Sequence, residues 1–178
     1  MTYSIDNFKA AINKHGGLAQ ANRFKVVLPN LDNGIDPRDI DIFCTNVGLP
    51  GKQIATLDKN IGALNYKIPY GEVFVETSMT FLVPNTYNIK KYFVNWQKLA
   101  FNTDTLEPGY RKDYVKEVII QQLTKVSEDP VYELTLLNAF PISIGETTFS
   151  NEQNGLVTLT VAFQFDRYKE KFYEHGPW

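Results

Sequence analysis

The chain has 178 residues, of which 43% are hydrophobic and 21% are charged, and its formal net charge is −2. This length suffices for one domain with its own core, so we expect a single domain over residues 1–178. A net charge near zero argues against a DNA-binding face built from Lys and Arg. The single cysteine, Cys44, excludes an internal disulfide, and we expect a buried structural thiol there. No apolar run is long enough to cross a bilayer, and residues 1–15 lack the apolar core of a signal peptide, so we expect synthesis in the cytoplasm without membrane insertion.

The first part of the chain predicts a short helix and two strands. The helix spans residues 4–14, where Ser4 can cap its start. Its apolar face is formed by Ile5, Phe8 and Ile12. Strands are predicted at residues 24–28 and 40–46, and the turn residues between them predict a loop at residues 31–39.

Residues 52–70 are the least patterned stretch of the chain. They contain Gly62 and Pro69 and show only weak alternation, so we expect a long loop or hairpin that projects from the body. Residues 73–83 alternate more strongly and predict a strand. The apolar face of that strand consists of Val75, Met79, Phe81 and Val83.

One internal helix is predicted at residues 87–101, after the helix-breaking pair Pro84-Asn85. Its apolar residues recur at a spacing of 3.6 residues, which indicates a helix packed against a core. This stripe consists of Ile89, Tyr92, Phe93, Trp96 and Ala100. We therefore expect Phe93 and Trp96 to be structural core residues.

The C-terminal half reads as consecutive strands. Residues 115–124 and 131–138 predict a hairpin, and residues 140–145 predict a kinked continuation of its second strand. Residues 155–166 show the clearest alternation in the chain, with one apolar and one polar face. The charged and aromatic tail, residues 167–178, is too short to fold alone, so we expect it to dock on a neighbouring element or subunit.

Strands mostly follow strands along this chain. The order predicts a mainly β fold, an antiparallel β-sandwich or barrel with one internal packed helix and a short N-terminal helix.

No catalytic or ligand-binding motif accompanies this architecture. His15 and His175 lie near opposite ends of the sequence, and neither has a second ligand at metal-binding spacing. The glycines match no phosphate-binding loop, and the scarcity of His disfavours a catalytic triad. The sequence therefore predicts a protein that is not an enzyme, with no cofactor, no metal and no catalytic residue.

Several segments together resemble the tail tube proteins of contractile-tailed bacteriophages. They are the opening from Phe8 to Leu28, Cys44-Thr-Asn-Val-Gly-Leu-Pro-Gly51, Tyr66-Lys-Ile-Pro-Tyr-Gly71, the helix with Phe93-Val-Asn-Trp-Gln97, and Phe140-Pro-Ile-Ser-Ile-Gly-Glu146. The resemblance covers nearly the whole chain, and the order of the segments carries more weight than any one of them.

The resemblance implies a structural virion protein whose hexameric rings stack into the tail tube, the conduit for genome ejection. It implies contacts with the tail sheath protein, the baseplate and tail terminator proteins, and with the tape measure protein and passing DNA in the lumen. Assembly would take place in the host cytoplasm. The candidate lumen-wall residues are Thr158, Thr160 and Gln164. The candidate ring-stacking residues are Leu57, Lys59, Asn60, Leu64 and Tyr66.

Two other structural roles fit the same pattern, a baseplate tube initiator and a type VI secretion tube protein. A monomeric β-sandwich module that binds glycans is the alternative from a different class. Its oligomeric state separates it from the tube proteins, because a binding module would stay monomeric at high concentration.

Overall fold

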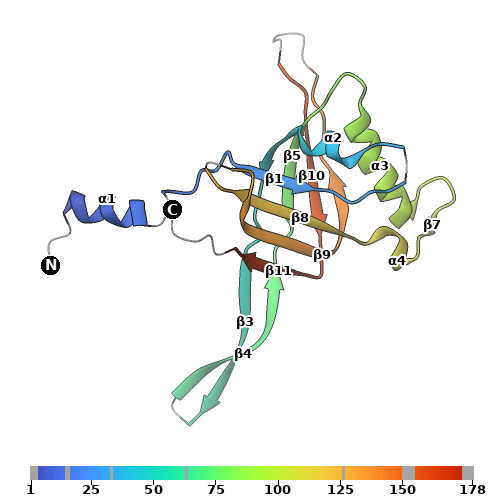
Figure 1. The fold of residues 1–178 in the computed structure, drawn as a ribbon. Helices are drawn as coiled ribbons and strands as arrows, with labels where there is room; N and C mark the ends of the chain where they lie inside the picture. The colour runs from blue at the N-terminus through green and yellow to red at the C-terminus, as the bar shows by residue number, and fades with distance from the viewer. Residues whose placement is uncertain are drawn as a thin grey trace.

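The structure is a computed structural model, and it describes residues 4–14, 17–32, 34–62, 64–125, 127–149 and 155–173. The fold is mainly β with antiparallel pairing, which confirms the predicted fold class (Figure 1). In chain order its elements are α1 (Ile5–Lys14), β1 (Phe24–Val27), α2 (Pro37–Asp41), β2 (Cys44–Val47), β3 (Lys52–Ile61), β4 (Leu64–Phe74), β5 (Thr77–Leu82), α3 (Asn88–Ala100), β6 (Phe101–Asn102), β7 (Glu107–Pro108), α4 (Arg111–Tyr114), β8 (Lys116–Leu123), β9 (Pro130–Ile144), β10 (Thr158–Gln164) and β11 (Arg167–Phe172).

Strand β9 joins two layers of one strongly bent sheet, whose strand order is β1-β8-β9-β10-β5-β2. Its first part pairs with β8 and β11, whereas residues 140–144 pair with β10. The change of partner follows Asn138, whose positive φ of 55° is tolerated by asparagine better than by most residues. We call β1, β8, β11 and the first part of β9 the first layer. The second layer consists of β2, β5, β10 and residues 140–144.

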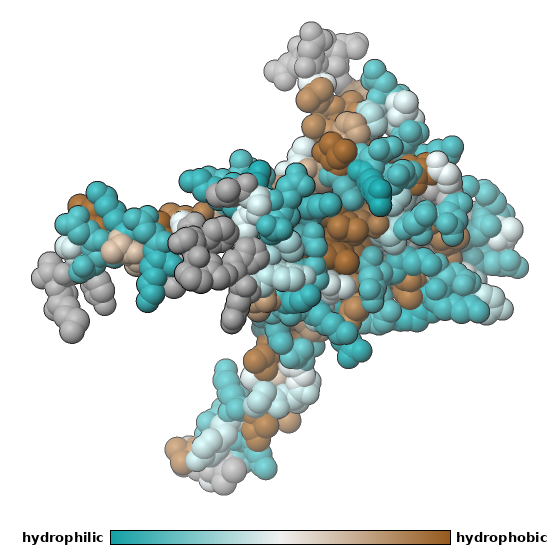
Figure 2. Space-filling model, viewed as in Figure 1, coloured by the Kyte–Doolittle hydropathy of each residue, from teal (hydrophilic) through white to brown (hydrophobic). Residues whose placement is uncertain are grey.

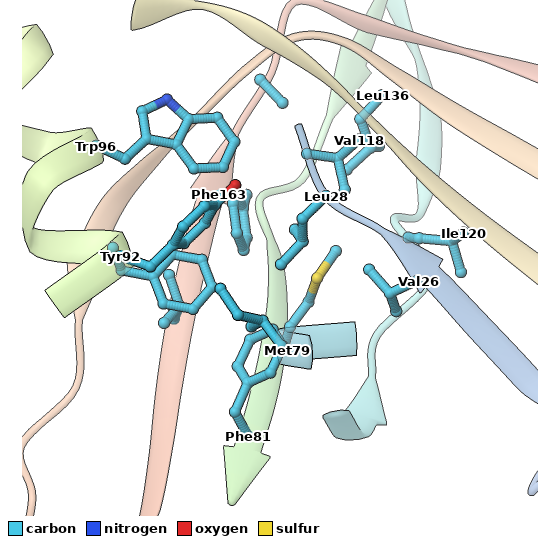
Figure 3. Packing of buried hydrophobic residues seen from close by; sticks show 14 of the residues in the cluster. Val26, Leu28, Met79, Phe81, Tyr92, Trp96, Val118, Ile120, Leu136 and Phe163 are labelled. Atoms are coloured by element: carbon cyan, nitrogen blue, oxygen red, sulfur yellow. The ribbon is translucent and has the colours of Figure 1, made fainter. Parts of the chain in front are cut away.

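The core lies between the two layers, and period-two alternation supplies its side chains (Figure 3). The first layer contributes Val26, Val118, Ile120, Leu134 and Leu136. The second layer contributes Met79, Phe81, Leu159, Val161 and Phe163. Each of these side chains is at most 4% exposed, so the alternation read from residues 155–166 and from most of 73–83 marks a real core face.

Helix α3 covers one side of this core with its apolar stripe. Phe93 and Trp96 are both fully buried, and the Trp96 ring lies 5.8 Å from that of Phe163. The indole N–H of Trp96 donates a hydrogen bond to the backbone oxygen of Tyr114 in α4, at 2.7 Å. The Tyr92 hydroxyl donates to the backbone oxygen of Pro29. These two bonds satisfy the polar ends of otherwise buried aromatic side chains.

The prediction for residues 31–46 was wrong in part. A short helix, α2, occupies the end of the predicted loop and the start of the predicted strand, and β2 begins only at Cys44. The side chain of Asp36 accepts a hydrogen bond from the Arg38 N–H at 2.9 Å, and Pro37 suits the first helical turn. Ile40 is therefore buried while Ile42 is 81% exposed, whereas a continuous strand would place both on the same face.

The predicted strand at residues 73–83 is also interrupted. Strand β4 ends at Phe74 and β5 begins at Thr77, where the chain leaves a projecting hairpin and enters the second layer. Val75 lies in this interruption and is 56% exposed instead of facing the core.

Residues 52–74 form that hairpin from β3 and β4, with pairing from Lys52↔Phe74 to Ile61↔Leu64 (Figure 1). The ribbon shows it extending away from the two layers. Its base is held by Phe74, whose ring lies 5.2 Å from that of Tyr168 and 5.9 Å from that of Phe165.

The first part of the predicted tail forms a strand that pairs with another strand of the same chain. Strand β11 pairs with β9 from Arg167↔Leu137 to Phe172↔Tyr132, and residues 174–178 lie outside the described residues. The assignment of residues 1–178 to a single domain stays a prediction.

Candidate functional site

The three candidate lumen-wall residues lie together on the outward face of the second layer. Thr158, Thr160 and Gln164 are exposed on β10. The intervening apolar residues of the same strand point into the core, so the pleat forces these polar side chains outward.

Neighbouring strands extend this face with residues that the sequence reading did not single out. The Thr80 hydroxyl on β5 lies 3.2 Å from that of Thr160, and the Thr45 hydroxyl on β2 donates to the Thr80 backbone oxygen at 3.1 Å. Ser78 and Ser143 flank β10 at the position of Ala162, one on each side. We call this surface the hydroxyl face; it consists of Thr45, Ser78, Thr80, Ser143, Thr158, Thr160 and Gln164. Ser78 and Thr80 alternate with Met79 and Phe81, and that pattern could have identified them.

The second layer differs from the first in charge. None of its strand segments, which are β2, β5, β10 and residues 140–144, contains Asp, Glu, Lys or Arg. The first layer carries charged residues on all of its strands, including Lys25, Glu133, Arg167, Lys169 and Lys171. One face of the subunit is thus polar without charge, and the opposite side is charged.

The candidate ring-stacking residues lie on the β3–β4 hairpin, and all five are exposed. Leu57 is 63% exposed and Leu64 is 62% exposed, although both are large and apolar. Figure 2 shows apolar residues interspersed with polar ones along the hairpin, at the lower end of the view. Near the base, Lys52 and Glu72 form a salt bridge at 2.7 Å. The apolar side chains of the hairpin therefore have little cover from their own subunit, which is typical of a surface that meets another protein.

The described residues show little capacity for chemistry. They contain no group of three or more His, Cys, Asp or Glu side chains arranged to hold a metal ion. Cys44 is half-buried, and burial raises the pKa of its thiol to about 12. A thiol held protonated in this way is a poor nucleophile. Among the residues that the structure describes, no helix has the length and apolar character needed to cross a membrane.

A family model and several solved structures match this chain. A family model described as phage tail tube protein matches residues 10–171. A comparison with curated protein sequences finds no match. The tube terminating cap of the anti-feeding prophage has a similar structure, with a TM-score of 0.66 at 16% identity over 88% of this chain and 92% of that one.

A chain of the PVC sheath-tube complex, from an extracellular contractile injection system, has a TM-score of 0.65 at 16% identity over 97% of this chain and 100% of that one. Hcp1 from Flavobacterium johnsoniae is more distant, with a TM-score of 0.50 at 11% identity over 85% of this chain and 97% of that one. At these identities the structural similarities show a shared fold.

Proposed function

The chain belongs to the phage tail tube protein family and is a structural tube protein, and on that premise we propose that its copies form hexameric rings that stack into a conduit for genome ejection. The observation that carries the proposal is the hydroxyl face, a sheet surface without charged side chains. We assign the protein no catalytic role.

Ring closure would take place at the two edges of the second layer. Strand β2 pairs only with β5, and residues 140–144 pair only with β10, so each has a free edge among the described residues. Free edges present unpaired backbone groups that favour pairing with another chain. A head-to-tail contact between the β2 edge of one copy and the β9 edge of the next would close a ring and join the second layers into one barrel.

In such a barrel the hydroxyl face would line the lumen. Lys and Arg side chains bind phosphates and release counterions, which would retain the passing DNA. A wall of Thr, Ser and Gln side chains has neither attraction nor strong repulsion for the backbone phosphates. The lack of charge therefore supports a wall along which DNA slides.

The β3–β4 hairpin would connect successive rings. Its exposed leucines and Tyr66 would become buried against the next ring, and this burial would offset the entropy lost when the hairpin is held in place. Lys59 and Asn60, close to its tip, would supply polar contacts at the same junction.

The partners follow from the position of such a protein in a contractile particle. The similar structures include a tube terminating cap, a sheath-tube complex and a baseplate. We infer that this chain contacts a tail sheath protein on the outside of the tube and baseplate and terminator proteins at its ends. The tape measure protein and DNA would occupy the lumen, and assembly would occur in the host cytoplasm before incorporation into the virion tail.

Light scattering on a sizing column, together with negative-stain microscopy, tests the assembly. We expect rings or rods from the purified protein alone or with a baseplate nucleus. Ile142→Lys places a charge on the free edge of β9 and should prevent ring closure. Leu106→Lys, in the exposed turn between β6 and β7, is the matched control and should assemble. A wild-type protein that stays monomeric under both conditions would contradict the proposal and favour a binding module.

A further inference from the structure

Asp41 is a partly buried carboxyl group that the tube function does not use. It is the last residue of α2, and three residues further on the chain enters β2. The Leu28 backbone N–H donates a hydrogen bond to the carboxylate of Asp41, which links α2 to the end of β1. The other oxygen, Oδ1, is buried and has no hydrogen-bond partner among the described residues.

The surroundings of Asp41 offer little compensation for a negative charge. Lys25 of β1 is the favourable charge nearby, and Asp36 of α2 is an unfavourable one. Cys44 of β2 and Tyr92 of α3 lie within electrostatic range of the carboxyl group, and burial raises the pKa of both groups so that they stay neutral. The Tyr92 hydroxyl already donates to a backbone oxygen, so it does not serve Oδ1.

Water could reach this carboxyl if the corner between α2 and β2 opened. Asp41 is one of the residues that line a cleft of about 680 Å³ between β1 and α2. The polar residues that line the cleft with it are Asn30, Asp32, Asp36 and Arg38. An outward movement of α2 would hydrate Oδ1, and it would also loosen the packing of Ile40, the α2 residue that belongs to the core.

We propose that Asp41 makes the α2–β2 corner a pH-sensitive element, which is closed around a protonated carboxyl group and opens more readily once that group is ionised. The inference concerns the single subunit and does not require ring formation. Because β2 is an edge strand, a looser corner would also make the position of that edge less well defined.

The direction of the pH effect follows from proton binding. Burial is the largest cause that raises the pKa of Asp41, from 3.8 to about 7, and the Leu28 hydrogen bond and Lys25 oppose it. An open corner restores the ordinary value, so the closed corner binds the proton more tightly. The stabilisation is complete below about pH 4, is lost as the pH rises through 7, and changes no further above that.

Native-state hydrogen exchange between pH 5 and pH 8, corrected for intrinsic exchange rates, measures this opening. The reporting amides are those of Phe43, which donates to Ile40, and Leu82, which donates to Phe43. We expect their opening constants to rise about tenfold or more between pH 5 and pH 7 in the wild type. Asp41→Asn should abolish the rise, and Asp39→Asn, an exposed carboxyl on the same helix, should leave it unchanged.

The inference is overturned if Asp41→Asn keeps the wild-type pH dependence or if the wild type shows none. A second measurement does not depend on any variant. Titration of the wild-type Asp41 carboxyl carbon by NMR should have a midpoint near 7, and a midpoint near 4 would overturn the inference.

Discussion

Trp96 is the side chain whose removal should destabilise the fold most clearly. It is 0% exposed, and its ring lies 6.0 Å from that of Tyr92 and 5.8 Å from that of Phe163. Replacing a fully buried tryptophan by alanine removes these contacts, leaves a cavity and costs about 3–5 kcal/mol. The change also leaves the Tyr114 carbonyl without its donor, which adds about 1 kcal/mol. We expect Trp96→Ala to lower the free energy of unfolding by about 4–6 kcal/mol, a large part of the stability of a typical domain.

Urea unfolding followed by circular dichroism measures this loss at constant pH. Trp96→Phe keeps a ring in the core but removes the N–H donor, so it should cost less than half as much as Trp96→Ala. Tyr110→Ala is the matched control, because Tyr110 is aromatic but 79% exposed, and its loss should stay within about 0.5 kcal/mol. A loss below about 2 kcal/mol for Trp96→Ala, or equal losses for the alanine and phenylalanine variants, would refute the described packing of α3.

Three further predictions concern the lumen, the hairpin and a close backbone contact. Replacing Thr160 and Gln164 by Lys should permit tube assembly but slow genome ejection, most strongly at low salt. Unchanged ejection would contradict the assignment of these residues to the lumen wall, and loss of rings would place this face in a subunit interface. Deleting residues 57–63 should leave a folded subunit, by circular dichroism, whose rings do not stack, and long tubes from this variant would exclude the proposed role of the hairpin. Gly109→Ala should lower the free energy of unfolding, measured by urea denaturation, by about 1–3 kcal/mol, because a Cβ there would lie 1.9 Å from a backbone oxygen of α3. Gly51→Ala is the control and should change this free energy little, because a Cβ at Gly51 would meet no atom within 4 Å.

The periodicity of the sequence was sufficient to predict the core and the fold class. The alternation around Leu159 and Val161 and the helical stripe with Trp96 depend only on neighbours along the chain, because a strand and a helix each repeat their geometry locally. The same alternation placed Thr160 outward. Its role as lumen wall stays a prediction, because it depends on how copies of the chain pack together.

Local patterns were insufficient where two elements meet. The apolar residues Ile40 and Ile42 suggested a strand, but the helix start at Asp36 and Pro37 places them on different sides. Likewise, Val75 falls on the same predicted strand face as Met79, yet it lies in the break between β4 and β5 and is exposed.

The sequence by itself determined which side chains share a face, since that property is set by backbone geometry within a few residues. Only the tertiary structure decided what each face meets. It brought Asp41 within electrostatic range of Tyr92 and Cys44, which belong to different elements, and it joined Thr45, Thr80 and Thr160 into one surface. Burial, charge compensation and hydrogen bonding depend on such distant partners, and no local pattern encodes them.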